Sequence, residues 1–243
     1  MVRDDRPLVA LTMGDVAGVG PEVIARAWSD SPLRTLARPL VVGSAAVLDR
    51  ALRSLGGGPA IQRINEPEEA QPNALTIPCL DINGADLANV PPGRVSARAG
   101  RAAYEFLIAA IDLALAGRVD AITTLSMNKE SLHAAGIPHP GHTEILAERC
   151  GVTDHAMMLY LGPPVGPADS GLGVIHVTLH VPLRQVFELL TIDAIERKIV
   201  MADWALRPLT NGRAPHVAVT GLNPHAGENG LFGDEEIRII APA

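Results

Sequence analysis

Aromatic residues are scarce in this sequence, at 3% of 243 residues, although 47% of the residues are hydrophobic. The core must therefore be built from Ala, Val, Leu and Ile. Such a composition is common in α/β enzymes, whose buried parallel strands are continuous aliphatic runs. The length suits one large domain or two small ones.

Long apolar runs and paired cysteines are also lacking. No run approaches the roughly 18 apolar residues that a membrane-spanning helix needs. The N-terminal stretch MVRDDRPLVALTMGD carries charges and lacks the apolar segment of a secretory signal. The two cysteines, Cys79 and Cys150, lie far apart and in no paired motif. We therefore expect a protein of the reducing cytoplasm with no membrane partner.

The chain has no block of Lys or Arg, and its net charge is -7. Binding to nucleic acid needs clustered cations that neutralise phosphates, so no nucleic-acid partner is expected. A small phosphorylated substrate is compatible with this charge, because backbone amides and a few Lys or Arg side chains can hold it.

Short aliphatic runs alternate with helical patterns along the chain, and this alternation predicts an α/β fold with a largely parallel sheet. The clearest helix spans 96–117, where Ser96 can cap the first turn. A stretch rich in Pro and Gly, 65–93, predicts irregular connections between two lobes. The expected strands are 8–13, 39–42, 121–125, 156–161, 173–179 and 216–220; the other expected helices begin near residue 21 and cover 45–55, 129–135, 143–150, 182–190 and 194–205.

The first motif, MGDVAGVGPE at 13–22, lies between an expected strand and an expected helix. Its glycines allow the backbone to approach a ligand closely, and a helix N-terminus favours an anion. The alternative is a tight strand-to-helix turn without a ligand. The motif lacks the G-x-G-x-x-G pattern, so it does not indicate a Rossmann nucleotide site.

The second motif contains Asn128-Lys129-Glu130 and then Gly141-His142-Thr143-Glu144. Lys129 directly after a strand is well placed to meet a carboxylate or phosphate. His142 and Thr143 stand where a helix begins, and there a hydroxyl can bind a ligand. The alternatives are a solvated surface lysine and ordinary helix capping by Thr143.

Two histidines stand at the ends of two expected strands, His180 in VTLHVPL and His225 in GLNPHAGE. The carboxyl ends of parallel strands face the crevice where α/β enzymes bind ligands. Imidazole suits zinc and other transition metals, and a catalytic zinc site needs three protein ligands. His180 and His225 are therefore candidate metal ligands of an incomplete set. Structural histidines are the alternative.

The segments MGDVAGVGPE, NKESLHAAG, GHTEILA, VTLHVPL and GLNPHAGENGLFGDEE occur in the order and spacing of the 4-hydroxythreonine-4-phosphate dehydrogenase (PdxA) family, which this chain resembles along essentially its whole length. The resemblance implies an isocitrate/isopropylmalate dehydrogenase-like fold of two lobes, 1–97 and 98–243, with the active site in the cleft. It implies a homodimer in which each active site lies near the subunit interface.

The resemblance also implies roles for single residues. His180 and His225 become two of three metal ligands, and the metal is zinc, with magnesium or cobalt as alternatives. His142 and Thr143 bind substrate, His142 and Lys129 are candidate catalytic residues, and Gly14, Asp15 and Gly18 are candidate cofactor-binding residues. The family's third metal ligand, a His in a His-Asp-Gln-Gly stretch, and much of its NAD site lie in segments that the sequence lacks, so we expect a truncated reading frame. Val16 and Ser126-Met127 depart from family positions where Pro is common.

The implied reaction is the NAD- or NADP-linked oxidation of 4-phosphohydroxy-L-threonine, followed by decarboxylation, in pyridoxal phosphate biosynthesis. One alternative is a dehydrogenase of 4-phosphorylated threonate or erythronate in sugar-acid catabolism. An alternative of another class is a truncated, non-catalytic remnant.

Overall fold

A computed structural model of the chain describes residues 4–30, 32–82, 87–163, 171–210 and 212–243. The chain divides into two compact units, Met1–Thr153 and Asp154–Ala243. Within the described residues, no helix is long and apolar enough to cross a membrane.

The first unit is built on a five-stranded sheet in which every neighbouring pair is parallel. The strand order is β3-β4-β2-β1-β5. The strands are β1 (Leu8–Thr12), β2 (Arg38–Gly43), β3 (Ala60–Ile64), β4 (Thr76–Asp81) and β5 (Ala121–Thr124). The expected α/β class with a mostly parallel sheet is confirmed.

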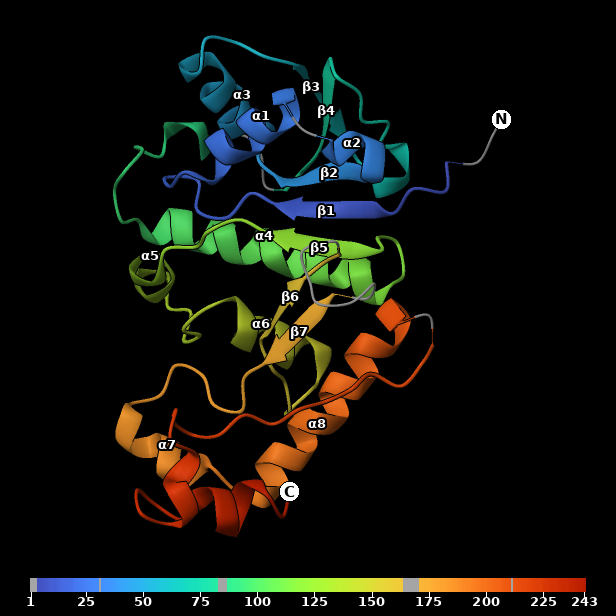
Figure 1. The fold of residues 1–243 in the computed structure, drawn as a ribbon. Coiled ribbons are helices and arrows are strands. Elements are labelled where there is room, and N and C mark those ends of the chain that lie inside the picture. Colours follow the sequence, from blue (N-terminus) through green and yellow to red (C-terminus); the bar gives the residue numbers. More distant parts are fainter. Residues whose placement is uncertain (1–3, 31, 83–86, 164–170, 211) are drawn as a thin grey trace. The chain divides into compact units, whose positions relative to one another are not determined.

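Helices cover both faces of this sheet, with α1 and α3 on one side and α4 on the other (Figure 1). Right-handed crossovers explain the arrangement. The chain leaves β1 in one direction toward β2 and later returns through α4 to β5 on the opposite side of β1. The helices are α1 (Gly20–Asp30), α2 (Leu33–Leu36), α3 (Ala45–Ser54), α4 (Ala97–Leu115), α5 (Lys129–Ala134) and α6 (His142–Cys150), with short 3-10 turns η1 (Pro67–Glu69) and η2 (Leu87–Asn89).

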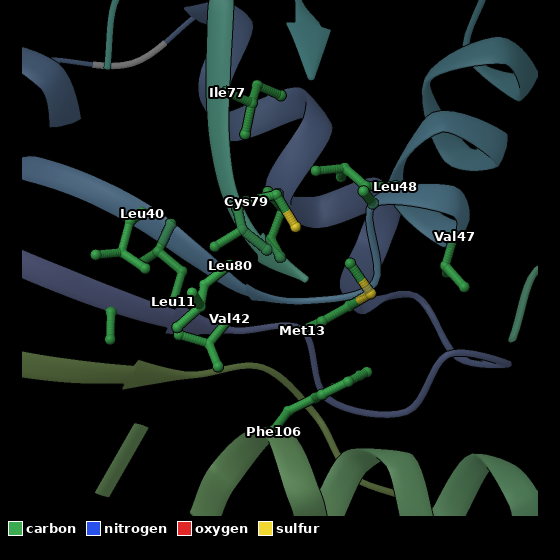
Figure 2. Packing of buried hydrophobic residues seen from close by; sticks show 14 of the residues in the cluster. Leu11, Met13, Leu40, Val42, Val47, Leu48, Ile77, Cys79, Leu80 and Phe106 are labelled. Carbon is green, nitrogen blue, oxygen red and sulfur yellow. The ribbon is translucent and has the colours of Figure 1, made fainter. Parts of the chain in front are cut away.

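The core of the first unit is aliphatic, as the composition predicts, with a few large side chains between the layers. Figure 2 shows Phe106 of α4 pointing toward Met13 at the end of β1, and both are fully buried. Cys79 lies in the same core, where burial raises the pKa of its thiol. Both cysteines are free, and only Cys150 is exposed.

The second unit contains an antiparallel pair of strands, β6 (Met158–Leu161) and β7 (Leu172–Ile175). Its helices are α7 (Leu183–Leu189) and α8 (Ile192–Leu206), followed by η3 (Arg207–Thr210), η4 (Ala226–Asn229) and a π-helical turn η5 (Glu236–Ile240). Among its described hydrophobic residues, only Leu190, Ile195 and Ala202 are buried.

Several predicted elements are wrong. Strand β4 lies inside 65–93, which we expected to be irregular, and it is a central strand of the sheet. The strand expected at 173–179 ends at Ile175, and the segment 216–220 forms no strand. That segment is exposed and pairs with no described strand.

The compact units divide at Thr153, whereas the expected lobe boundary lies at 97/98. Residues 98–153 add the rest of α4 and strand β5 to the first unit, and β5 pairs with β1. The division into lobes 1–97 and 98–243 concerns the family's fold and stays a prediction.

Candidate functional site

The loops after β1 and β5 meet at the carboxyl edge of the sheet. These strands are neighbours, and β2, which follows β1 in the chain, lies on the side of β1 opposite to β5. In open α/β sheets this switch point is where ligands bind. The loops are joined directly, because the Asp15 amide donates a hydrogen bond of 2.9 Å to the Ser126 carbonyl.

Two glycines of the first motif permit this close approach. Gly14 has a φ of +71°, and a Cβ on it would lie 2.4 Å from the Ser126 carbonyl oxygen. A Cβ on Gly20 would lie 2.2 Å from the Met13 carbonyl oxygen. Gly18 differs, since it is exposed and its φ is not positive. Gly14 and Gly20 therefore pack the turn against its own chain, and Gly18 is the glycine whose backbone is accessible.

Asp15 is 4% exposed, and its side chain closes the turn from inside. Its Oδ1 accepts a hydrogen bond of 2.7 Å from the Ala17 amide. A second support, which no sequence motif indicates, is Arg50 of α3. Its guanidinium donates to the carbonyl oxygens of Val16 at 2.7 Å and of Val90 at 2.7 Å. These hydrogen bonds hold the turn in place without a ligand.

His142 begins α6 and is tied to the end of β5. Its Nε2 lies 3.1 Å from the Leu125 carbonyl oxygen. A carbonyl only accepts, so Nε2 carries the proton, and Nδ1 of the neutral ring keeps a lone pair. Burial lowers the pKa of His142, and the hydrogen bond to Leu125 offsets part of this effect. The neutral imidazole is therefore favoured near neutral pH.

The remaining candidates of the second motif stand at helix starts. Asn128 caps α5, because its Oδ1 accepts from the Ser131 amide at 2.8 Å. The next residue, Lys129, is exposed, and its side chain forms no hydrogen bond or ion pair with any described residue. Thr143 is exposed in the first turn of α6, whose N-cap is Gly141 and lacks a capping side chain. Lys129 and Thr143 therefore have polar groups available to a ligand.

His180 does not stand at the end of a strand, contrary to the prediction. The strand ends at Ile175, and His180 has a φ of 55°, in the left-handed region that non-glycine residues seldom adopt. His180 is exposed and lies two residues before Pro182, the N-cap of α7. An exposed imidazole on a residue with a strained backbone is compatible with a ligand role.

His225 follows an Asx-type turn, in which its amide donates 2.9 Å to Asn223 Oδ1. Its Nδ1 lies 2.7 Å from Glu228 Oε1, and its ring is tilted against Phe232 with centroids 5.3 Å apart. A carboxylate on one ring nitrogen is the arrangement that fixes metal-binding histidines and leaves the other nitrogen available. The Nε2 atom of His225 is therefore available to bind a metal ion.

The metal site as a whole is incomplete. Across the described ranges of the chain, no group of three His, Cys, Asp or Glu residues could hold a metal ion. The two imidazoles suit a transition metal in kind, but two donors fall short of the three that a catalytic zinc site uses. The structure thus brings the first two motifs together through Leu125 and Ser126, and it does not assemble His180 and His225 into a closed donor set.

The model of the family described as pyridoxal phosphate biosynthetic protein PdxA matches residues 35–243. A D-threonate 4-phosphate dehydrogenase from Bordetella bronchiseptica is 43% identical over 98% of this chain and 65% of its own length. A 4-hydroxythreonine-4-phosphate dehydrogenase from Desulfosudis oleivorans is 41% identical over 98% of this chain and 68% of its own length. The chain therefore spans about two thirds of the length of these curated relatives.

Solved structures agree in fold. The crystal structure of a 4-hydroxythreonine-4-phosphate dehydrogenase from Klebsiella pneumoniae superposes with a TM-score of 0.87 and 43% identity. That match covers 99% of this chain and 70% of the solved chain.

Proposed function

This chain belongs to the family of the pyridoxal phosphate biosynthetic protein PdxA, and on that premise we propose that it acts as an NAD-linked dehydrogenase on a small phosphorylated hydroxy acid. The observation that carries the proposal is the junction at Leu125 and Ser126. There the β1 turn and the imidazole of His142 are held at the edge where α/β enzymes bind ligands. The preferred substrate is 4-phosphohydroxy-L-threonine, with decarboxylation following oxidation.

His142 acts on the substrate through Nδ1. Because Nε2 is engaged with Leu125, Nδ1 is the nitrogen that can accept a hydrogen bond or a proton from a substrate hydroxyl. Its lowered pKa keeps this nitrogen unprotonated near neutral pH. The imidazole therefore orients the hydroxyl, or takes its proton when the alcohol is oxidised.

Thr143 and Lys129 hold the anionic groups of the substrate. The Thr143 hydroxyl and the free amides of the first turn of α6 favour a phosphate or carboxylate. The exposed ammonium of Lys129 supplies a positive charge from the start of α5. Lys129 is the weaker candidate of the two, because its long side chain is not fixed by any described neighbour.

The cofactor is NAD or NADP, and Gly14, Asp15 and Gly18 are the residues of this chain proposed to line its site. Oxidation removes a hydride from the carbinol carbon and a proton from its hydroxyl, and the nicotinamide is the hydride acceptor. The β-keto acid formed then loses carbon dioxide. Support for the residues is geometric: the turn is held rigidly by Arg50 and Ser126, with the Gly18 backbone exposed.

His180 and His225 are the side chains that would hold a divalent metal, zinc in the first instance, with magnesium or cobalt as alternatives. Such a metal polarises hydroxyl and carbonyl oxygens and stabilises negative charge that develops on them. The described residues contain no complete donor set, so a third ligand would have to come from elsewhere. We also propose the homodimer and the two-lobed, isocitrate dehydrogenase-like arrangement of the family, which sedimentation and a crystal structure of the protein would test.

The names of the relatives favour a second candidate substrate. One relative is named for D-threonate 4-phosphate and another, of similar identity, for 4-hydroxythreonine-4-phosphate. Turnover of both compounds by the protein, measured side by side as NADH formation with added Zn²⁺, separates the two. Preference for 4-phosphohydroxy-L-threonine supports the proposal, and preference for the sugar acid contradicts the assignment to vitamin biosynthesis.

The incomplete donor set is the observation that favours a non-catalytic chain. The same assay decides the matter when it includes His142→Ala as a matched variant. NADH formation that depends on His142 excludes a binding-only remnant. Absence of turnover with both substrates, in protein that binds Zn²⁺ and remains folded, contradicts the dehydrogenase proposal for this chain.

A further inference from the structure

His139 lies in the loop that leads from α5 to the proposed substrate residues, and its side chain joins this loop to α6. Its Nε2 lies 2.8 Å from Oε2 of Glu148, which is in α6. A carboxylate only accepts, so Nε2 of His139 carries the proton and donates. The side chain of His139 is 20% exposed. The pair therefore ties the loop to a helix that begins three residues after His139, at His142.

The middle of this loop has little other support. At its start Ile137 is 5% exposed, and its amide donates to the Leu132 carbonyl at 3.1 Å. Residues 138 and 140 are prolines, which have no amide hydrogen to donate. Residues 138–140 form no backbone hydrogen bond with any described residue. Among the described residues, the contact between His139 and Glu148 is therefore the polar contact that holds the middle of the loop.

The first turn of α6, which contains His142 and Thr143, is weakly closed. Its N-cap, Gly141, provides no capping side chain. The first backbone bond of the helix, from the Ile145 amide to the Gly141 carbonyl, is 3.5 Å long. That length exceeds the usual range of about 2.7–3.2 Å. The position of this turn therefore depends on the contacts that hold the loop before it.

Of the two proposed substrate residues, Thr143 depends more on this loop. The ring of His142 has a contact of its own, from Nε2 to the Leu125 carbonyl oxygen at 3.1 Å. The side chain of Thr143 is exposed and forms no hydrogen bond with any described residue. The backbone of the first turn therefore sets where the Thr143 hydroxyl lies.

We propose that His139 is a positioning residue for substrate binding: through Glu148 it holds the first turn of α6 so that Thr143 and His142 contact the anionic substrate together. His139 and Glu148 themselves do not touch the substrate. The inference rests on the proposed role of His142 and Thr143 in binding a phosphorylated hydroxy acid.

The test is a double-mutant cycle on the affinity for 4-phosphohydroxy-L-threonine, measured by calorimetric titration of the full 243-residue chain without cofactor. We expect His139→Ala and Glu148→Ala each to weaken binding by about two- to fivefold, the range of a partly exposed ion pair. The double variant should weaken it no further, because either single change already removes the contact. Glu148 is 69% exposed, so Glu148→Ala should fold even if His139→Ala does not. Wild-type affinity in the single variants, or losses that multiply in the double variant, would overturn the proposal.

A conservative variant and a matched control separate positioning from stability. His139→Gln keeps an amide donor near the position of Nε2, so it should restore most of the affinity. Asp112→Ala is the control, because it removes the ion pair that joins α6 to α4, from Arg149 Nε to Asp112 Oδ1 at 2.7 Å, and leaves the loop contact intact. It should lower the unfolding midpoint without changing substrate affinity. Equal losses of affinity in Asp112→Ala and His139→Ala, or no recovery in His139→Gln, would overturn the positioning role.

His142→Ala and Thr143→Ala separate this inference from the function on which it rests. If both bind the substrate as the wild type does, the proposed substrate site is wrong and the inference falls with it. If both lose affinity while His139→Ala and Glu148→Ala do not, the substrate site stands and the positioning role of His139 is wrong.

Discussion

The close packing of the candidate site depends on the absence of a side chain at Gly14. Its φ of +71° disfavours any L-residue, and a Cβ would overlap the Ser126 carbonyl at 2.4 Å. Left-handed backbone alone costs about 1–2 kcal/mol, and overlap with backbone adds to it. We expect Gly14→Ala to lower the free energy of unfolding by more than about 2 kcal/mol, measured by urea denaturation. Gly136 is the matched control, with a φ of +75° and no atom within 4 Å of an added Cβ. Equal losses for Gly14→Ala and Gly136→Ala would contradict the account.

His142 makes stability depend on pH. Burial lowers its pKa in the folded chain below the usual value of 6.5. Between these two pKa values the unfolded chain binds a proton that the folded chain does not, so the contribution is present above about pH 6.5 and is lost as the pH falls. We expect His142→Gln to flatten the fall in unfolding midpoint between about pH 7.5 and about pH 5. A difference between wild type and variant that does not change with pH argues against a buried, neutral His142.

At the scale of elements, a glycine sets the distance between α4 and α5. A Cβ on Gly100 would lie 2.0 Å from the Ser131 carbonyl oxygen. Replacing glycine by alanine inside a helix ordinarily stabilises by roughly 0.5–1 kcal/mol. Here we expect the opposite sign, because α5 must move, and Lys129 with it. A stability of Gly100→Ala at or above that of wild type, measured by thermal unfolding, would show that the helices are less closely packed than described.

Elements that local pattern specifies were predicted well, and elements that depend on their neighbours were not. The helix expected at 96–117 is α4, capped by Ser96 as predicted. Strand β4 was missed because Pro78 lacks an amide proton and is rarely found in a central strand. The aliphatic segment 216–220 has the pattern of a strand, yet none of its described residues lies in one. A strand needs a partner, and the pattern of one segment cannot show that the partner is present.

In the candidate site, too, the features set by local sequence were predicted, and those that depend on distant residues were not. Motif spacing placed the 13–22 turn after a strand and His142 at the start of a helix. The structure joins both to the end of β5, through Ser126 and Leu125. Arg50 was missed as a support, because it acts on backbone carbonyls that are distant in sequence. A charged residue within a helix gives no sign of which loop it reaches.

At the scale of the whole molecule, the two units differ in how much they bury. The first unit contains the main hydrophobic core, whereas the described part of the second unit buries three hydrophobic side chains and leaves Trp204 77% exposed. Amides protected by a large core exchange only on global unfolding. We therefore expect hydrogen exchange, followed by mass spectrometry, to be faster across 154–243 than across β1, β2 and β4. Equal protection in both units would contradict this picture.

We propose that the edge of the sheet beside Leu125 binds a phosphorylated hydroxy acid through His142 and Thr143. The most direct measurement is calorimetric titration of the protein with 4-phosphohydroxy-L-threonine, without cofactor, for the wild type, His142→Ala and Thr143→Ala. Glu105→Ala on α4 is the control outside the proposed site. We expect each site variant to weaken binding by about tenfold or more, because it loses one hydrogen bond to a charged group. The control should bind as the wild type does. Wild-type affinity in both site variants would contradict the claim and place the substrate elsewhere.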